Sequence, residues 1–153
     1  MRKILSKIDR AYLAGLIDGD GAIMACIEKH NEKKFGFRVR VAIKISQNNN
    51  AILKRSKRTI GFGHIRHNRT QYKWYSLDQL AIEKFLKLIV IYLKIKQKQA
   101  KLAIKIIATK ILTVSNLIKI AKMADQLSKF NVRSAGRRKN FARMIEESVS
   151  PND

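Results

Sequence analysis

The chain has 153 residues, a length typical of one domain, and its 33 lysine and arginine residues against 11 acidic residues give a net charge of +22. Such a charge attracts polyanions, either nucleic acid or an anionic membrane surface. The single cysteine, Cys26, excludes an intrachain disulfide and a cysteine metal cage, and the longest apolar run, residues 88–93, is far too short to span a bilayer.

The first predicted element is a helix over residues 8–18. Gly15 and Gly19 are four residues apart, so in a helix they share one side, and Ala14 adds a third small residue. Each interior glycine costs a helix about 1 kcal/mol, which close packing against another backbone would offset. We therefore interpret this face as a contact for a second helix.

The helix leads into two acids, Asp18 and Asp20. They could be no more than a helix-terminal acid and a turn former. In a chain so poor in acids, however, two carboxylates flanked by glycines favour a site for a hard divalent cation, which takes oxygen ligands. Magnesium there would polarise a scissile phosphate and lower the pKa of a bound water. Because other acids are scarce, we expect a complete metal cluster to need a second copy of the chain.

Two β-hairpins are predicted from alternating apolar and polar residues. The clearest alternation covers residues 22–30 and 37–47, with a turn over residues 31–36 between them. Two shorter strands follow, at about residues 62–68 and 71–77. Together they predict a four-stranded antiparallel sheet with one apolar face, covered by helices, and one basic face that stays open.

Helices separate and follow the hairpins. A short basic helix is predicted over residues 50–59, and Asp78 is placed to cap a helix that continues to residue 93. Further helices are predicted at about residues 96–109, 114–130 and 138–148. The fold class is therefore α+β, with the order αββαββα before the last helices.

The basic face of the sheet is the strongest candidate for a ligand surface. A charge run is usually a solvated surface, but here cations repeat at strand spacing and alternate with other polar groups. A two-stranded ribbon fits the major groove of DNA, and mixed donors and acceptors are what contacts to base edges require. A membrane-binding face would not need Glu28 and Asn68. The predicted DNA-binding residues are Met24, Cys26, Glu28, His30, Arg38, Arg40, Lys44, Arg66, Asn68, Lys73 and Tyr75.

Other reactive residue types are weaker candidates. His64 and His67 are three apart, so in a strand they face opposite sides and cannot share a metal. Cys26 has no histidine partner that the sequence places beside it, so we do not expect a nucleophile.

Residues 13–21, LAGLIDGDG, resemble the signature of the LAGLIDADG homing endonucleases. Three further segments, residues 45–47, 61–66 and 93–100, resemble the single-motif, homodimeric branch of that family encoded by organellar introns. The resemblance extends from about residue 8 to residue 148.

The resemblance implies one endonuclease domain over residues 1–153, with the motif helix at about 8–20, a DNA-binding sheet at about 21–77 and C-terminal helices at about 78–148. Such proteins are homodimers whose saddle-like sheets lie in the major groove of a long pseudo-palindromic double-stranded DNA target. They use Mg²⁺, for which Mn²⁺ or Ca²⁺ can substitute in binding, and cut both strands to leave 3′ overhangs.

The resemblance also assigns site residues. Asp20 matches the metal-binding acid, with the Gly19 carbonyl as a further ligand. Gln47 matches the residue that positions solvent, and Lys96 matches the active-site lysine, with Lys98 as the alternative if the register differs. The expected dimer contacts are Leu13, Gly15, Leu16 and Gly19.

One position departs from the family pattern: Ala51 stands where close relatives carry a basic residue, and Lys54 is the nearest substitute. Three other functions stay open. The chain could be a maturase that binds intron RNA, a DNA-binding regulator without catalysis, or a cationic membrane binder, although we expect no membrane partner. Its many lysine, isoleucine and asparagine residues suggest an AT-rich gene, and hence a chloroplast or mitochondrion.

Overall fold

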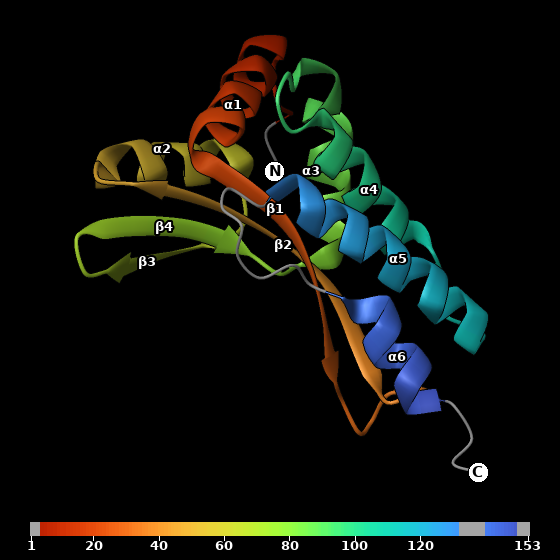
Figure 1. Ribbon diagram of the computed structural model, residues 1–153. Helices are drawn as coiled ribbons and strands as arrows, with labels where there is room; N and C mark the ends of the chain where they lie inside the picture. The colour runs from red at the N-terminus through yellow and green to blue at the C-terminus, as the bar shows by residue number, and fades with distance from the viewer. Residues whose placement is uncertain (1–3, 132–139, 150–153) are drawn as a thin grey trace.

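A curved four-stranded antiparallel sheet forms the centre of the molecule in a computed structural model, which describes residues 4–131 and 140–149 (Figure 1). The strands lie in the order β1-β2-β4-β3. Their bounds are β1 Gly21–Lys29, β2 Phe37–Gln47, β3 His64–Asn68 and β4 Gln71–Ser76. The alternation of apolar and polar residues therefore predicted all four strands of the sheet and both hairpins.

Helices cover one face of this sheet and leave the other open (Figure 1). They are α1 Lys7–Asp20, α2 Asn50–Ile60, α3 Gln79–Ile89, α4 Gln97–Ala108, α5 Val114–Asn131 and α6 Phe141–Val149. The start predicted for the last helix, residues 138–139, lies outside the described residues. None of the described helices has the length and apolarity that crossing a bilayer requires. The α+β fold and its element order are thus as predicted.

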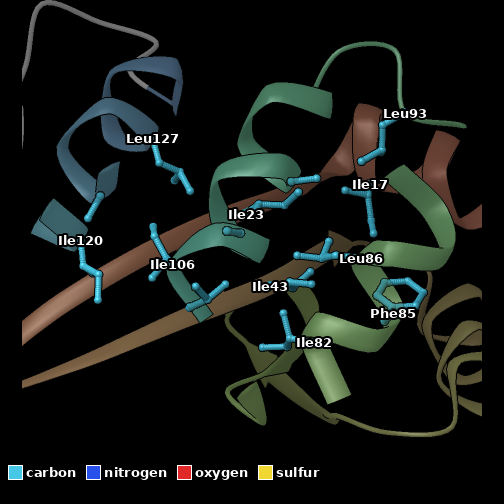
Figure 2. Packing of buried hydrophobic residues seen from close by; sticks show 14 of the residues in the cluster. Ile17, Ile23, Ile43, Ile82, Phe85, Leu86, Leu93, Ile106, Ile120 and Leu127 are labelled. Atoms are coloured by element: carbon cyan, nitrogen blue, oxygen red, sulfur yellow. The ribbon is translucent and has the colours of Figure 1, made fainter. Parts of the chain in front are cut away.

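The core lies between the sheet and the helices. Ile23 of β1 and Ile43 of β2 face each other across the two strands, and both are fully buried. Side chains from α1, α3, α4 and α5 converge on them, among them Ile17, Leu86 and Ile106 (Figure 2). Full burial of one such side chain contributes roughly 1.5 to 3 kcal/mol. This packing fixes the end of α1 against the start of β1.

The helix predicted to run to residue 93 ends earlier. α3 stops at Ile89, a short 3₁₀ turn covers Val90–Tyr92, and Leu93 is extended with φ −71° and ψ 135°. The apolar run would support a longer helix, but the backbone N–H groups of residues 94–96 bind Asp18 instead of continuing it. A contact from a distant part of the chain therefore overrides the local periodicity.

Gln79 satisfies an edge of β2 that no strand covers. β4 pairs with β2 over residues 43–47 alone. At Val41, the Gln79 side chain replaces a neighbouring strand: its Oε1 accepts from the Val41 N–H and its Nε2 donates to the Val41 carbonyl, each at 2.8 Å. Asp78 caps the same helix by accepting from the Ala81 N–H. The first turn of α3 is thus fastened to the sheet.

Gly63→Ala tests the packing where α2 leads into β3. Gly63 has φ +91°, and a Cβ there would lie 2.4 Å from Nε1 of the buried Trp74, which donates to the Phe62 carbonyl. Gly61→Ala is the matched control, because Gly61 has φ +86° with open space around it. We expect urea unfolding to show a loss of about 1 to 2 kcal/mol for the control, from backbone strain alone, and a clearly larger loss for Gly63→Ala. Equal losses would contradict the packing described here.

Candidate active site and nucleic-acid interface

Asp18 holds the segment before α4 in place. Its carboxylate accepts hydrogen bonds from the backbone N–H groups of Lys94 at 2.7 Å, Ile95 at 3.2 Å and Lys96 at 2.9 Å. These donors precede the first residue of α4, so Asp18 acts as a cap supplied by a different helix. Of the two interpretations that the sequence left open, the structural one fits Asp18, because its carboxylate is committed to backbone donors.

Asp20 differs from Asp18 although it is only two residues away. It is the last residue of α1, its side chain is exposed, and it accepts a hydrogen bond from Nε2 of Gln47 at the end of β2. β1 and β2 are antiparallel, with Gly21 opposite Ile45, and this register brings Gln47 beside the end of α1. The predicted pair of Asp20 and Gln47 is therefore brought together by the hairpin.

Lys96 also lies at the end of α1. Its side chain is buried, and its Nζ donates to the backbone carbonyl of Asp18 at 2.8 Å. Lys98 is exposed, with its Nζ 5.7 Å from the centre of the Phe130 ring. A pocket of about 710 Å³ is lined by Asp20, Gly19 and Lys96 but not by Lys98. This placement favours Lys96 over Lys98 as the active-site lysine.

The donor set suits a hard cation but is small. Asp20 and Gly19 both line the pocket. The Asp20 carboxylate and the Gly19 carbonyl are oxygen donors of the kind that Mg²⁺ prefers. Within residues 4–131 and 140–149, no group of three or more histidine, cysteine, aspartate or glutamate residues is placed to hold a metal ion. The residues present fit a divalent cation bound through Asp20, with ligands from elsewhere completing its shell.

The outer face of α1 is apolar and open. Gly15 and Gly19 are exposed, and a Cβ built at either would meet no atom within 4 Å. Ile8 and Tyr12 lie on the same face with 82% and 54% of their surfaces exposed. Sequence reasoning missed these two, although their spacing from Gly15 and Gly19 was a usable signal.

Two residues assigned to that face lie elsewhere. Leu13 and Ala14 are fully buried in the core of their own chain. Leu13 was expected to contact a second copy, but its side chain is fully buried within its own chain, as that of Ile17 is, so that expectation is wrong. Leu16 is partly buried and packs at the border between the core and the open face. Three of the four expected contacts thus remain available.

The open face of the sheet carries the predicted DNA-binding residues. Neighbours across the strands include Cys26 and Arg40, Lys44 and Tyr75, and Arg66 and Lys73. Ten of the eleven residues belong to the four strands and share this face by their alternation, while His30 follows the last residue of β1. The register adds residues that the sequence reasoning omitted: Ala22, Ala42, Ser46, His64 and Gln71. Period-two alternation was the signal for them too.

Charges on this face perturb one another. Burial of the Lys44 ammonium, and repulsion from Lys73 beside it, lower the pKa of Lys44. A hydrogen bond from Arg38, with further attraction from Arg40, lowers the pKa of Glu28 against the opposing effect of its desolvation. The face therefore holds cations at close quarters, which is favourable only where an anion comes to meet them.

The LAGLIDADG endonuclease family model matches residues 13–103, which include the last part of α1 from residue 13, the whole sheet and Lys96. The chain belongs to the LAGLIDADG endonuclease family. Among curated LAGLIDADG proteins, it is 35% identical to DNA endonuclease I-CreI of Chlamydomonas reinhardtii over 99 residues, which are 63% of this chain and 60% of that protein. It is 30% identical to DNA endonuclease I-CvuI of Chlorella vulgaris over 100 residues, 63% of this chain and 62% of that protein. The matches thus span less than two-thirds of either relative.

Solved LAGLIDADG structures match nearly the whole chain. The homing endonuclease I-CvuI in complex with an I-CreI target has a TM-score of 0.82 and 26% identity, covering 94% of this chain and 93% of that one. The archaeal intron-encoded homing endonuclease I-Vdi141I, complexed with DNA, has a TM-score of 0.79 at 20% identity, covering 92% and 93%. The second likeness shows the fold alone. The four-stranded sheet with helices on its back is therefore the LAGLIDADG fold.

The contrast between the two acids of the motif can be measured in the unfolding of this LAGLIDADG chain. Asp18→Ala removes the acceptor of three backbone donors, so we expect a loss of about 2 kcal/mol. Asp20→Ala is the control, and because Asp20 is exposed its loss should stay within about 0.5 kcal/mol. Urea unfolding at matched protein concentration measures both. A loss for Asp20→Ala as large as for Asp18→Ala would contradict the structural role of Asp18.

Proposed function

We propose that this chain is a site-specific homing endonuclease that acts as a homodimer and makes a metal-dependent double-strand cut in a long pseudo-palindromic DNA target, leaving 3′ overhangs. The observation that carries the proposal is the position of Asp20. It stands, exposed, where the open apolar face of α1 meets the open basic face of the sheet. The apolar face of α1 fits a second copy of the chain, the basic face of the sheet fits DNA, and Asp20 lies between these two faces.

The proposed dimer rests on the open face of α1. Residues 11–17 of α1 carry no charged side chain, and a helical segment that is apolar on every side is stable in water only when its whole surface is covered. The core covers one side of α1, whereas Ile8, Tyr12, Gly15 and Gly19 leave the other side open. The glycines would let a second α1 approach closely, and two-fold symmetry would bring the two Asp20 carboxylates together at the ends of the paired helices. This supplies the additional acid that a single chain does not offer.

The chemistry is hydrolysis of a phosphodiester. The Asp20 carboxylate and the Gly19 carbonyl would hold Mg²⁺, with Mn²⁺ or Ca²⁺ able to substitute in binding. When bound, the cation lowers the pKa of a water molecule and offsets charge on the scissile phosphate. The Gln47 amide, fixed by its hydrogen bond to Asp20, presents its oxygen for orienting solvent. The Lys96 ammonium, held on the Asp18 carbonyl, lies where it can stabilise negative charge that develops on the phosphate.

We assign substrate binding to the open face of the sheet. Its open face is basic, and a curved two- to four-stranded surface of this kind fits the major groove, so each copy would bind one half of the target. The cations that repel one another there, such as Lys44 and Lys73, gain from a polyanion. I-CvuI, whose structure was solved in complex with its target in the presence of calcium, supports duplex DNA as the partner. Intron RNA remains a second possible partner.

We also propose an organelle, chloroplast or mitochondrion, as the site of action. The support is the composition of the chain, rich in lysine, isoleucine and asparagine as AT-rich organellar genes often encode. An intact set of Asp20, Gln47 and Lys96 in one site supports an enzyme over a DNA-binding regulator that has lost catalysis.

Asp20→Asn tests catalysis separately from binding. It removes one charge and a metal ligand but keeps the size of the side chain, so we expect cleavage of target DNA in Mg²⁺ to be lost while binding in Ca²⁺ persists. Asp78→Asn is the matched control: it removes the same charge, and asparagine caps helices as well as aspartate does. The control should cleave normally. Cleavage by Asp20→Asn at the wild-type rate would refute the catalytic assignment.

Gly15→Leu tests the pairing of α1. A leucine there meets open space in a single chain, so the subunit should fold, but it would block the approach of a second helix. We expect light scattering to show a monomer and double-strand cleavage to be lost. Ala108→Leu adds a similar bulk at an exposed position of α4 and should leave the dimer intact. A Gly15→Leu variant that stays dimeric would rule out this face as the interface.

A further inference from the structure

We propose that Glu28 is a positioning residue that holds Arg38 and Arg40 as a pair of guanine-recognising side chains in the outer part of each half-site. The inference rests on the proposed function, since it concerns how the sheet discriminates among DNA sequences. It goes further by assigning a base and a place in the target to two named residues, and an indirect role to a third.

The three side chains form one hydrogen-bonded unit. Oε1 of Glu28 accepts from Nε and Nη2 of Arg38 at 3.0 and 2.5 Å, and from Nη2 of Arg40 at 2.6 Å. The register explains the geometry, because Glu28 lies directly opposite Arg38 on the neighbouring strand and Arg40 is the next residue on the same face. A single carboxylate oxygen thus orients two guanidinium groups.

Stability does not explain this unit. The side chains of Arg38, Arg40 and Glu28 are 34%, 31% and 38% exposed, and ion pairs that retain so much contact with water contribute little to folding. The consequence is instead a loss of freedom: long arginine side chains that would sample many rotamers are held in one arrangement before DNA arrives. Side chains ordered in advance lose less entropy on binding.

The donors that remain suit guanine. Glu28 engages the Nε and Nη2 side of Arg38 and one Nη2 donor of Arg40, which leaves the Nη1 groups and the second Nη2 hydrogens available. Two parallel donors match the O6 and N7 acceptors of guanine in the major groove. Arg40 Nε is buried and, among the described residues, has no hydrogen-bond partner, so Glu28 is what orients this guanidinium.

One carboxylate oxygen of Glu28 is committed to the two arginines. This oxygen, Oε1, already accepts three hydrogen bonds, and Arg38 keeps the pKa of the carboxyl below its ordinary value, so it stays ionised at neutral pH. A direct contact from glutamate would select cytosine through its amino group. The geometry favours the indirect role, and the two roles differ in the effect of removing Glu28.

The place in the target follows from the length of β1. Glu28 lies seven residues beyond Gly21, the first residue after Asp20, in a continuous strand. At about 3.3 Å per residue this is roughly 23 Å, or about seven base pairs at 3.4 Å each. We therefore expect two neighbouring guanines roughly seven base pairs from the centre of the target.

The test is selection of bound duplexes from a library with randomised half-sites, in Ca²⁺ so that cleavage plays no part. The wild-type chain should enrich guanine at two neighbouring positions. Arg38→Ala should lose one preference and Arg40→Ala the other. Glu28→Ala should weaken both together, by about tenfold each, while raising affinity for random duplex because it removes a negative charge. Glu147→Ala, which removes the same charge from an exposed ion pair with Arg143 on α6, is the control and should leave both positions unchanged.

Several results would overturn the inference. A change at a single position in Glu28→Ala, or the loss of a cytosine preference that the arginine variants keep, would indicate that Glu28 contacts a base directly. A uniform loss of affinity in the arginine variants, with no change in preference, would indicate phosphate contacts. If the wild-type chain enriches no site at all, the proposed function itself fails. An enriched site without the two guanines would defeat this inference alone. Thermal unfolding of each variant confirms that it is folded.

Discussion

The hydrogen bonds between Asp18 and the backbone of residues 94–96 are the constraint on which the rest of the site depends. They end the apolar run after α3, set the start of α4, and carry Lys96 back to the end of α1, where its ammonium binds the Asp18 carbonyl. Without this cap, the segment has no reason to leave the helical path that its sequence favours. Asp18 therefore holds the elements of the site together, whereas Asp20 is available for chemistry.

The acidic residues near the site and the sheet also make specific contacts. The chain carries 33 cationic side chains and 11 acids, and the acids around the site and sheet each have a defined task. Asp18 caps a backbone segment, Asp20 meets Gln47 in the pocket, and Glu28 organises two arginines on the sheet. On the open face, in contrast, burial of the Lys44 ammonium and then repulsion from Lys73 lower the pKa of Lys44. A bound polyanion offsets the repulsion between neighbouring cations on such a surface, which is why we associate this face with DNA.

Much of this could be predicted from the sequence, because two of its signals are strong. Alternation predicted the strands and placed residues such as Arg38 and Lys44 on one face, and the capping aspartate marked the start of α3. The nine-residue motif pointed to the family that the comparison then showed. Register explains most of the rest: the contacts of Gln47 with Asp20 and of Glu28 with the arginines exist because the strands pair as they do.

The sequence predictions that proved wrong concern residues whose structure is set by contacts between distant parts of the chain. Residues 90–92 continue an apolar helical pattern, and no local feature announces that Asp18 will capture the next three N–H groups. Leu13 was assigned to the wrong side of α1 because residues 11–17 are uncharged on every side of the helix. Periodicity alone therefore cannot distinguish the face toward the core from the face toward a second copy. Burial settles the orientation: Leu13 and Ala14 are fully buried while Gly15 is exposed.

The central claim is that two copies of α1 pair so that both Asp20 carboxylates share cations above one step of DNA. A crystal structure of the chain with its DNA target, grown in Mn²⁺ and examined by anomalous scattering, tests it most directly. The account predicts a dimer on the duplex with manganese bound by Asp20 from each copy. A single chain on the DNA, or manganese bound away from Asp20, would contradict it.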